Sequence, residues 1–491
     1  MREGGSGSDA AIAMLSVALD RHAGEPLVRQ LYLRVRDLIL SRQLEAGVKL
    51  PSTRKLSDDL SVSRTVTADA FAQLAAEGFL DSRQGSGHFV AALPLPTQDL
   101  QSRSAATEAE DVECSIWSAR GVPFDPSWLG VDLFPAETWA RMTGRGWRRH
   151  RSEIIGRHWL GLPVLRSALS DHLRALRGFA LGPDQIMITA GGADALSMIG
   201  RAVKGADQDR PQAWVEDPGL MSARLRLTRE GVEPIAVPVD AEGLQVSEAE
   251  RRAPSAAFAL VTATRQFPLG MPLSLPRRLA LLDWSRRSGA IIVDDDYDGE
   301  IRFAGRPIQS LASLDPAARV LTLGSFSKLT FPGLRLGYVA GPPDLIVRLA
   351  AVRRETHGLV PTAVQAAFAE FIATGAFARH LRELRLQLTR RRQTLVEALT
   401  HDAGDLVEIL PQEVGMHLTV RLSARIAAKA SDVELAERAP AEGLVLLPLS
   451  QQYSGRVREQ GFFLGYAGWT DEEMRDAIGR LVRLLRTSAR F

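Results

Sequence analysis

The chain has 491 residues, with 60 Lys plus Arg against 58 Asp plus Glu, and one cysteine, Cys114. At about 150 residues per domain this length allows roughly two to four domains, and 45% hydrophobic with 24% charged residues excludes a wholly disordered or fibrous chain. A net charge of +2 gives no global reason to bind a polyanion, and one cysteine excludes an internal disulfide or a CxxC zinc site. No apolar run reaches the ~18 residues of a spanning helix, so we expect a cytoplasmic protein with no membrane partner.

The first part of the chain is expected to comprise a flexible tail, 1–24, and a small helical domain, 25–91. Apolar residues recur at helical spacing early in this domain and predict a first helix with one buried stripe. Two shorter helices are predicted to begin after Ser52 and after Ser63, because a serine hydroxyl there can accept a hydrogen bond from the first turn. Two short β-segments then form a hairpin that ends near Val90.

The second short helix carries hydroxyl and guanidinium groups on its outer, N-terminal side. Two helices joined by a tight turn, with such groups at the start of the second, suit insertion into the major groove of DNA. A plain three-helix packing module is the alternative. Overall charge does not decide between them, because residues 25–91 hold nine Lys and Arg against eight Asp and Glu. Any positively charged surface for DNA must therefore be confined to one part of this domain.

The string LPSTRKLSDDLSVSRTVTADAFAQLAAEGFLDSRQGSGHFV favours the DNA-binding interpretation. Over its whole length it resembles the winged helix-turn-helix of the GntR class of bacterial regulators. The resemblance and the helix face together imply contact of the second helix and the wing with double-stranded promoter DNA. The residues expected to make this contact are Arg54, Ser63, Arg64, Thr65, Thr67, Gly85 and Gly87.

Residues 92–119, with two prolines, many small polar residues and no sustained period, are expected to be a linker to a large domain, 120–491. In the large domain, continuous apolar strands alternate with helix-length segments. This pattern predicts an α/β fold with a mostly parallel sheet covered on both faces. The clearest strands are at 186–188, 213–215, 259–261, 291–293 and 320–323.

Two segments at the ends of these strands carry groups that suit a pyridine cofactor with a phosphate. After the first strand, a glycine turn that includes Gly192 opens a helix, whose backbone N–H groups can bind an anion. After the fourth strand come Asp295 and Tyr297; a carboxylate can keep a pyridine nitrogen protonated, and a phenol can hydrogen-bond a ring hydroxyl. The same acidic stretch resembles the opening of a calcium loop, but its twelfth position is Gly305 rather than Glu. A metal site is therefore the weaker interpretation.

A third segment, Gly324-Ser325-Phe326-Ser327-Lys328, follows the last of these strands. A lone lysine is usually a solvated surface charge. Here it lies among hydroxyls with Arg335 seven residues later, which fits an amine that forms a Schiff base beside a phosphate clamp. Arg265, at the end of another strand, is expected to line the same crevice. The nine histidines show no ligand-like pairing, so no metal is expected, and His417 is interpreted as a packed structural residue.

From about residue 120 to 485 the chain resembles a fold-type I aminotransferase. Together with the small N-terminal domain, which we call the head, it resembles the MocR/GabR family of pyridoxal phosphate-dependent transcriptional regulators. The most specific strings are VDDDYDGEIRF and GSFSKLTFPGLRLGY. The resemblance implies a smaller C-terminal α+β subdomain and a homodimer in which the heads are swapped onto the partner, head to tail. It also implies that Lys328 forms the Schiff base with pyridoxal 5′-phosphate, that Asp295 pairs with the ring nitrogen and that Tyr297 pairs with the ring hydroxyl. The residues that would hold the phosphate are Gly192, Ala193, Ser325, Ser327 and Arg335.

Four positions depart from the family pattern. Leu220 replaces a tyrosine that usually follows EDPG, Arg265 replaces a histidine, and Gly156 stands where a tyrosine is expected. Phe463 lies where aminotransferases have the arginine that grips the substrate α-carboxylate. The cofactor anchor is therefore family-like, whereas the substrate-recognition residues differ.

These observations favour a transcriptional regulator that senses a small amine or amino-acid-like effector through pyridoxal phosphate on Lys328, with at most a residual transamination half-reaction. A working aminotransferase with a secondary head is one alternative. It needs another carboxylate anchor, such as Arg265, Arg157 or an arginine of a partner subunit. A regulator that senses pyridoxal phosphate itself is the other alternative. The effector, the operator and the direction of control stay open.

Overall fold

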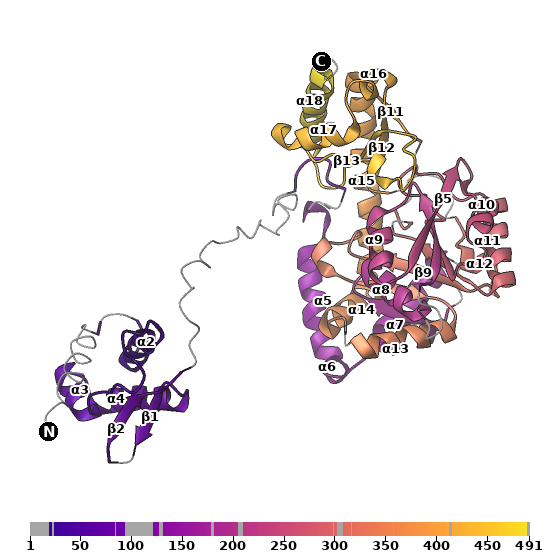
Figure 1. Cartoon of the computed structure of the whole chain (residues 1–491). Coiled ribbons are helices and arrows are strands. Elements are labelled where there is room, and N and C mark those ends of the chain that lie inside the picture. The colour runs from indigo at the N-terminus through magenta and orange to yellow at the C-terminus, as the bar shows by residue number, and fades with distance from the viewer. Residues whose placement is uncertain are drawn as a thin grey trace. The chain divides into compact units, whose positions relative to one another are not determined.

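The structure is a computed structural model of the whole chain. It describes residues 19–21, 24–83, 85–93, 121–126, 131–177, 181–204, 210–297, 299–301, 308–315, 317–356, 358–411 and 415–488. The chain forms two compact units, residues 1–112 and 113–491, which we call the head and the body (Figure 1). The expected tail and linker lie almost entirely outside the described residues. No helix in the described ranges is both long enough and apolar enough to cross a membrane.

The described part of the head is a helical domain with a hairpin, as the sequence predicts. Its elements are α2 (Leu27–Leu40), α3 (Thr53–Asp59), α4 (Arg64–Ala76), β1 (Leu80–Arg83) and β2 (Gly87–Val90). The side chains of Ser52 and Ser63 cap α3 and α4, accepting hydrogen bonds from the backbone N–H groups three residues later at 3.2 and 3.3 Å. Apolar side chains of α2 and α4 meet in one core, where Leu31, Phe71 and Leu74 are at most 1% exposed.

The body is built on an eight-stranded sheet of order β3-β10-β9-β8-β7-β4-β5-β6. β4, β5, β7, β8 and β9 are parallel, whereas β10 runs antiparallel to β3 and β9, and β6 runs antiparallel to β5. The strands are β3 (Ile186–Thr189), β4 (Gln212–Asp217), β5 (Glu233–Asp240), β6 (Gly243–Leu244), β7 (Phe258–Val261), β8 (Ile291–Asp295), β9 (Val320–Ser325) and β10 (Gly337–Ala340). The mostly parallel sheet predicted from the sequence is confirmed.

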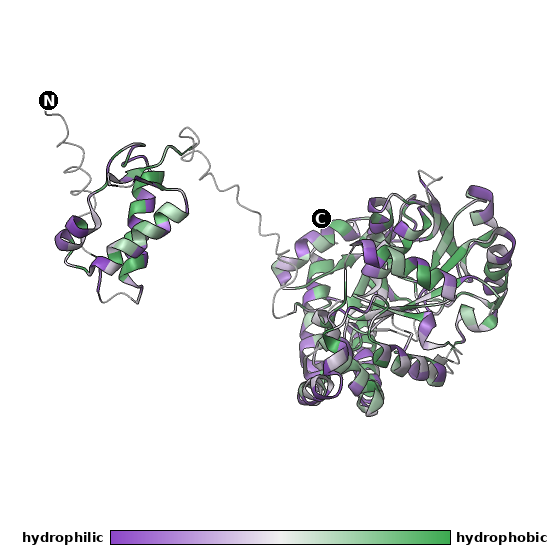
Figure 2. Cartoon of the chain, turned by 90° about the horizontal axis from the view of Figure 1, so that it is seen from below, coloured by the Kyte–Doolittle hydropathy of each residue, from purple (hydrophilic) through white to green (hydrophobic). Residues whose placement is uncertain are grey.

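Alternate residues of the strands enter different apolar cores, so helices cover both faces of the sheet. Ile291 and Val293 of β8 pack with α8, α9 and α13, whereas Ile292 packs with α10, α11 and α12. In Figure 2 the hydrophobic colour follows the strands of the body and the polar colour lies mainly on the outer helices. These helices are α8 (Gly192–Val203), α9 (Met221–Arg229), α10 (Val246–Arg252), α11 (Leu275–Ser288), α12 (Leu311–Leu314) and α13 (Pro343–Thr356).

A smaller α+β subdomain ends the chain, as expected. Its antiparallel sheet has the order β11-β12-β14-β13, with β11 (Val407–Ile409), β12 (His417–Leu422), β13 (Leu447–Pro448) and β14 (Gly461–Gly465). Its helices are α15 (Ala376–Ala403), α16 (Ala424–Ala427), α17 (Asp432–Arg438) and α18 (Asp471–Ser488). One apolar core joins this sheet to helices that precede β3 or follow β10. Those helices are α5 (Ala136–Arg149), α6 (Arg151–Ile154), α7 (Pro163–Arg177) and α14 (Thr362–Ala373).

Candidate functional site

The carboxyl ends of the parallel strands border a cavity of about 300 Å³, which is where open α/β sheets bind ligands. It is lined by Gly192, Ala193, Leu196, Leu220, Ser222, Ala223, Arg226, Thr262, Phe267, Asp295, Tyr297, Ser325 and Lys328. Six of the residues expected to hold a cofactor are among them. The other three, Ser327, Arg335 and Arg265, do not line the cavity.

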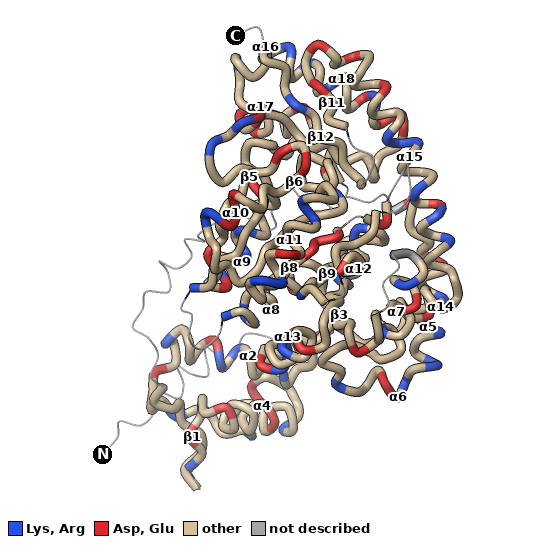
Figure 3. The backbone as a smooth tube through the Cα atoms, turned by 90° about the vertical axis from the view of Figure 1, so that its right-hand side faces the viewer, with Lys and Arg blue, Asp and Glu red and all other residues tan. Residues whose placement is uncertain are grey.

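An amine, a phenol and a carboxylate meet in this cavity. Lys328 follows β9 with an exposed side chain, and its Nζ lies 4.3 Å from the centre of the Tyr297 ring. Tyr297 is 9% exposed and lies two residues beyond Asp295, the last residue of β8. Figure 3 shows an acidic stretch of the chain, in red, beside the label of β8. The described part of the chain has no group of three or more His, Cys, Asp or Glu side chains placed to hold a metal ion; Asp298 lies outside it.

The N-terminus of α8 forms an end of the cavity that suits an anion. Gly191 caps this helix with φ +107°, a value that favours glycine, and a Cβ on Gly191 or Gly192 would meet only open space. Asp194, in the first turn, would repel an anion, but its carboxylate is paired with Arg353 at 2.8 Å. The helix end can therefore still present backbone N–H groups and a positive dipole.

Ser327 and Arg335, which follow β9 like Lys328, do not line the cavity. The Ser327 hydroxyl is buried, and within the described residues it has no hydrogen-bond partner. A buried hydroxyl of this kind calls for an acceptor such as a phosphate oxygen. Arg335 has φ +47°, an uncommon backbone conformation for a non-glycine residue that is often kept at functional sites. The groups at this cavity therefore fit a phosphate attached to an aromatic ring and an aldehyde carbon.

Arg265 lies behind Tyr297 rather than along the cavity, contrary to the expectation. It is 2% exposed, and its Nη1 donates to the Tyr297 hydroxyl at 3.0 Å. Its Nη2 donates to the backbone oxygen of His417 and lies 3.1 Å from His417 Nε2. Burial, together with the positive charges of Arg265 and Lys328, holds the pKa of His417 well below its ordinary value. His417 is packed, as predicted, but as part of the site.

Glu216 is a buried acid next to the site that the sequence did not reveal. It lies near the end of β4, and its Oε2 accepts hydrogen bonds from the Thr262 hydroxyl at 2.6 Å and the Thr262 backbone N–H at 3.3 Å. Burial raises the pKa of Glu216 to about 7, against the opposing effect of these hydrogen bonds. Asp294, which is 1% exposed, raises it further through its charge. Glu216 can therefore keep a proton near neutral pH.

Most of the residues expected to contact DNA lie on the surface of the head. Arg54, Ser63, Arg64, Thr65, Gly85 and Gly87 are exposed. Thr67 is an exception, and its expected outer position is wrong: it is 0% exposed. Its hydroxyl donates to the backbone oxygens of Thr53 and Arg64, each at 3.0 Å. One turn into α4 the side chain faces α3, so Thr67 fixes the angle between the helices and cannot touch DNA.

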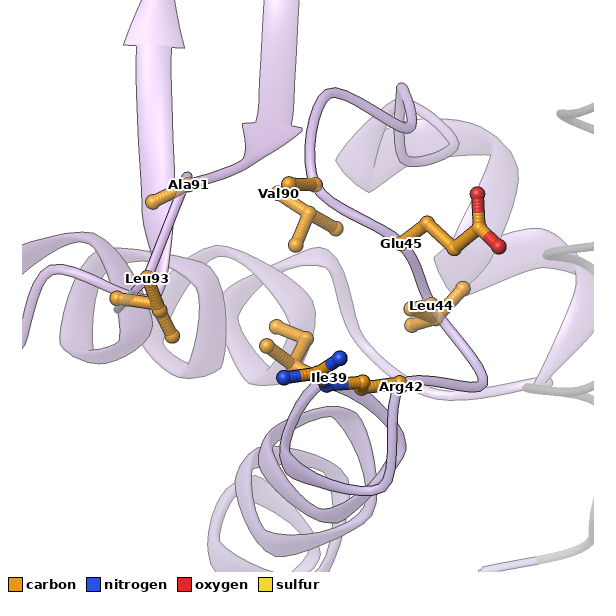
Figure 4. Close-up of a pocket in the computed structure, with 8 residues that line it drawn as sticks. Ile39, Arg42, Leu44, Glu45, Val90, Ala91 and Leu93 are labelled. Carbon is orange, nitrogen blue, oxygen red and sulfur yellow. The ribbon is translucent and has the colours of Figure 1, made fainter. Parts of the chain in front are cut away.

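Two cations lie beside the hairpin, in addition to the residues expected to contact DNA. Arg83 lies 4.7 Å and Lys49 5.7 Å from the ring of Phe89, so both sit beside the wing. The head also has a hollow of about 360 Å³ between the end of α2 and the residues after β2 (Figure 4). None of the residues expected to contact DNA lines this hollow.

Comparisons with known proteins agree with this division of the chain. Residues 27–90 match the family described as bacterial regulatory proteins, gntR family, and residues 150–481 match aminotransferase class I and II. A multiple substrate aminotransferase from Thermococcus profundus superposes with a TM-score of 0.69 at 24% identity, covering 78% of this chain and 96% of that one. A Pyrococcus horikoshii kynurenine aminotransferase gives 0.68 at 24% identity, covering 80% and 96%.

Curated relatives match the chain over nearly its full length. The "probable rhizopine catabolism regulatory protein MocR" of Rhizobium meliloti is 34% identical, covering 95% of both chains. The HTH-type pyridoxine biosynthesis transcriptional regulator PdxR of Corynebacterium glutamicum is 32% identical, covering 96% of this chain and 98% of the relative. The chain therefore belongs to the MocR/GabR family of transcriptional regulators, in which a GntR-type DNA-binding head is fused to an aminotransferase-like body.

Proposed function

We propose that the body binds pyridoxal 5′-phosphate through Lys328, and that a small amine competing with Lys328 for this cofactor changes how the head binds promoter DNA. The observation that carries the proposal is one cavity that combines an amine, a phenol, a carboxylate and a helix N-terminus. It occurs in a chain that also has a GntR-type head.

Pyridoxal phosphate, when bound, supplies a carbonyl carbon that joins reversibly to primary amines. Lys328 would provide the resident amine. Asp295 would hold a proton on the ring nitrogen, and the Tyr297 hydroxyl, which accepts from Arg265, would donate its own proton to the ring oxygen. The N-terminus of α8, with Ser325, Ser327 and Arg335, offers the donors that a phosphate requires.

DNA binding would rest on a few placed groups of the head. Arg54, Arg64 and Thr65, with Ser63 at the helix cap, would contact phosphates and base edges, and the backbone at Gly85 and Gly87 would let the wing approach the duplex. Because residues 25–91 have a net charge of only about +1, one copy should bind weakly. A homodimer with swapped heads would supply two linked copies and raise the effective concentration of the second.

The effector can control DNA binding only if it has different affinities for two arrangements of the dimer. In this proposal, loss of the bond between Lys328 and the cofactor is the change at the site that distinguishes the two arrangements of the dimer. The body then acts as a sensor rather than as a catalyst of repeated turnover.

An absorbance titration with a DNA-binding assay tests this proposal. Purified protein loaded with pyridoxal phosphate should show a visible band that Lys328→Ala abolishes and that the control Lys429→Ala, an exposed lysine, retains. The loaded wild type should retard a promoter fragment next to its own gene in a mobility-shift assay. No Lys328-dependent band, or no retarded fragment, refutes the proposal. Repeated turnover of an amino donor with a keto acid would favour the aminotransferase alternative, and DNA binding that responds to pyridoxal phosphate but to no amine would favour the vitamin as effector.

A further inference from the structure

The wall of the cavity beside Lys328 is aromatic. The Tyr297 ring, 4.3 Å from Lys328 Nζ, stands edge-to-face with Phe267 at 6.1 Å between ring centres. Phe267 in turn stands edge-to-face with Phe463 at 5.3 Å. Leu447, which pairs with Phe463 across β13 and β14, packs against the same cluster. The three aromatic side chains are at most 9% exposed. Tyr297 and Phe267 line the cavity and Phe463 packs against Phe267, so the cavity has an apolar wall backed by Phe463.

This wall is held in place from both subdomains of the body. The backbone N–H of Phe267 donates to the Thr262 hydroxyl at 3.0 Å, next to the strand β7. The hydroxyl of Thr419, in β12, donates to the backbone oxygen of Pro268 at 2.6 Å. Because Thr419 also pairs with Phe463 across β12 and β14, the wall is a fixed part of the fold.

The cations around the cavity already have partners. Within the described lining, the charged side chains are Lys328, Asp295 and Arg226. Arg226, in α9, donates from Nη1 to the Ser197 hydroxyl at 3.3 Å, and Ser197 belongs to α8, the helix whose N-terminus suits the phosphate. Arg265, behind the wall, is bound to Tyr297 and His417. Asp295 is an acid and offers no positive charge to an incoming carboxylate.

We propose that the effector is a primary amine with an apolar substituent and without a carboxylate on the carbon that bears the nitrogen. A carboxylate on that carbon would lose its water against the aromatic wall and would have to compete for guanidinium groups that are already hydrogen-bonded. An apolar substituent gains from the same surface.

This inference rests on the proposed function, because the amine must exchange with Lys328. The exchange forms the double bond between the cofactor's carbon and the effector nitrogen and breaks the one to Lys328. The two protons that leave the effector nitrogen end on the Lys328 amine, so no oxidant, reductant or water is consumed.

Matched pairs of compounds test the inference on the full-length protein loaded with pyridoxal phosphate. The pairs are 2-phenylethylamine with L-phenylalanine, 3-methylbutylamine with L-leucine, and ethanolamine with L-serine; each pair differs only in the carboxylate. The visible band should respond to each apolar amine at a concentration at least about tenfold lower than to its amino acid. It should also respond to 2-phenylethylamine at a lower concentration than to ethanolamine.

Equal or tighter binding of the amino acids overturns the inference, and so does a Lys328-dependent band that none of the six compounds shifts. The absence of such a band refutes the proposed function instead, so the two failures are distinguishable. In each apolar pair, the amino acid should need a higher concentration than the amine to shift the band. Phe463→Arg should reduce the ratio of these two concentrations, whereas Phe463→Leu should leave this ratio unchanged. If the Phe463→Arg protein fails to bind the cofactor, the concentration ratio measured with the wild-type protein still tests the inference. An amino-acid preference that Arg226→Gln removes would identify Arg226 as a carboxylate clamp and would contradict the inference.

Discussion

Replacing Glu216 with glutamine should stabilise the body, and the gain should grow with pH. Glu216 is 6% exposed and accepts hydrogen bonds from the Thr262 hydroxyl and backbone N–H. A glutamine side-chain oxygen can accept the same two bonds, so Glu216→Gln removes the ionisable group and can keep both bonds from Thr262. Burial raises the pKa of Glu216 from 4.5 to about 7.

The sign and size of the effect follow from proton linkage. Between pH 4.5 and 7 the folded body keeps a proton that the unfolded chain has lost, so the free energy of unfolding of the wild type falls as pH rises. A difference of about 2.5 pKa units, at about 1.4 kcal/mol each, corresponds to about 3 kcal/mol. The advantage of Glu216→Gln should therefore be small near pH 4.5 and reach about 3 kcal/mol at pH 8.

Tryptophan fluorescence during urea denaturation measures this effect on the body alone, because residues 1–112 contain no tryptophan. Trp214, two residues before Glu216, stacks on Trp284 at 3.8 Å and is fully buried. Glu437→Gln, at an exposed glutamate, is the matched control and should give a pH-independent difference near zero. A constant difference for Glu216→Gln between pH 5 and 8 would refute the raised pKa and the reasoning built on it.

Three further changes test other parts of the structure. Thr67→Val removes a buried hydroxyl that satisfies two backbone oxygens; it should cost the head about 1–2 kcal/mol and speed amide exchange in α3 and α4 by roughly 5- to 30-fold. Unchanged exchange would contradict this role. Arg64→Ala should weaken promoter binding and reduce the slope of log affinity against log salt by about one, whereas Arg229→Ala in the body should not; an unchanged slope would exclude a phosphate contact. Gly161→Ala should destabilise the body by about 2 kcal/mol or more, because φ is +90° and a Cβ would lie 2.3 Å from Ile188; a thermal midpoint equal to that of the wild type would count against this packing.

The strands of the sheet and the caps of the head were predictable because their signals are local. A continuous apolar run such as 291–293 divides its residues between two cores, which requires helices on both faces. Ser52 and Ser63 begin helices because each hydroxyl reaches a backbone N–H only three residues away. The meeting of Lys328 with Tyr297 was also predictable, because parallel strands end at the same edge of the sheet.

The errors and omissions concern contacts between residues far apart in the chain. Thr67 looks like a polar surface residue, but its hydroxyl bonds to Thr53, 14 residues away. Arg265 turns behind the cavity because His417, 152 residues away, accepts from it. Glu216 is buried where its carboxylate accepts a hydrogen bond from Thr262, 46 residues away. Neither the polarity of a residue nor the spacing of apolar residues along the sequence indicates contacts between residues so far apart in the chain.

The central claim is that the state of Lys328, either joined to pyridoxal phosphate or displaced from it by an amine, controls the binding of DNA by the head. Fluorescence anisotropy of a labelled promoter fragment measures this control, with the loaded protein before and after an amine that removes the Lys328-dependent band. The dissociation constant for DNA should change by at least about tenfold in the wild type and stay constant in Lys328→Ala. The same constant with and without the amine, while the band disappears, would contradict the claim, because a ligand with equal affinity for both states shifts nothing.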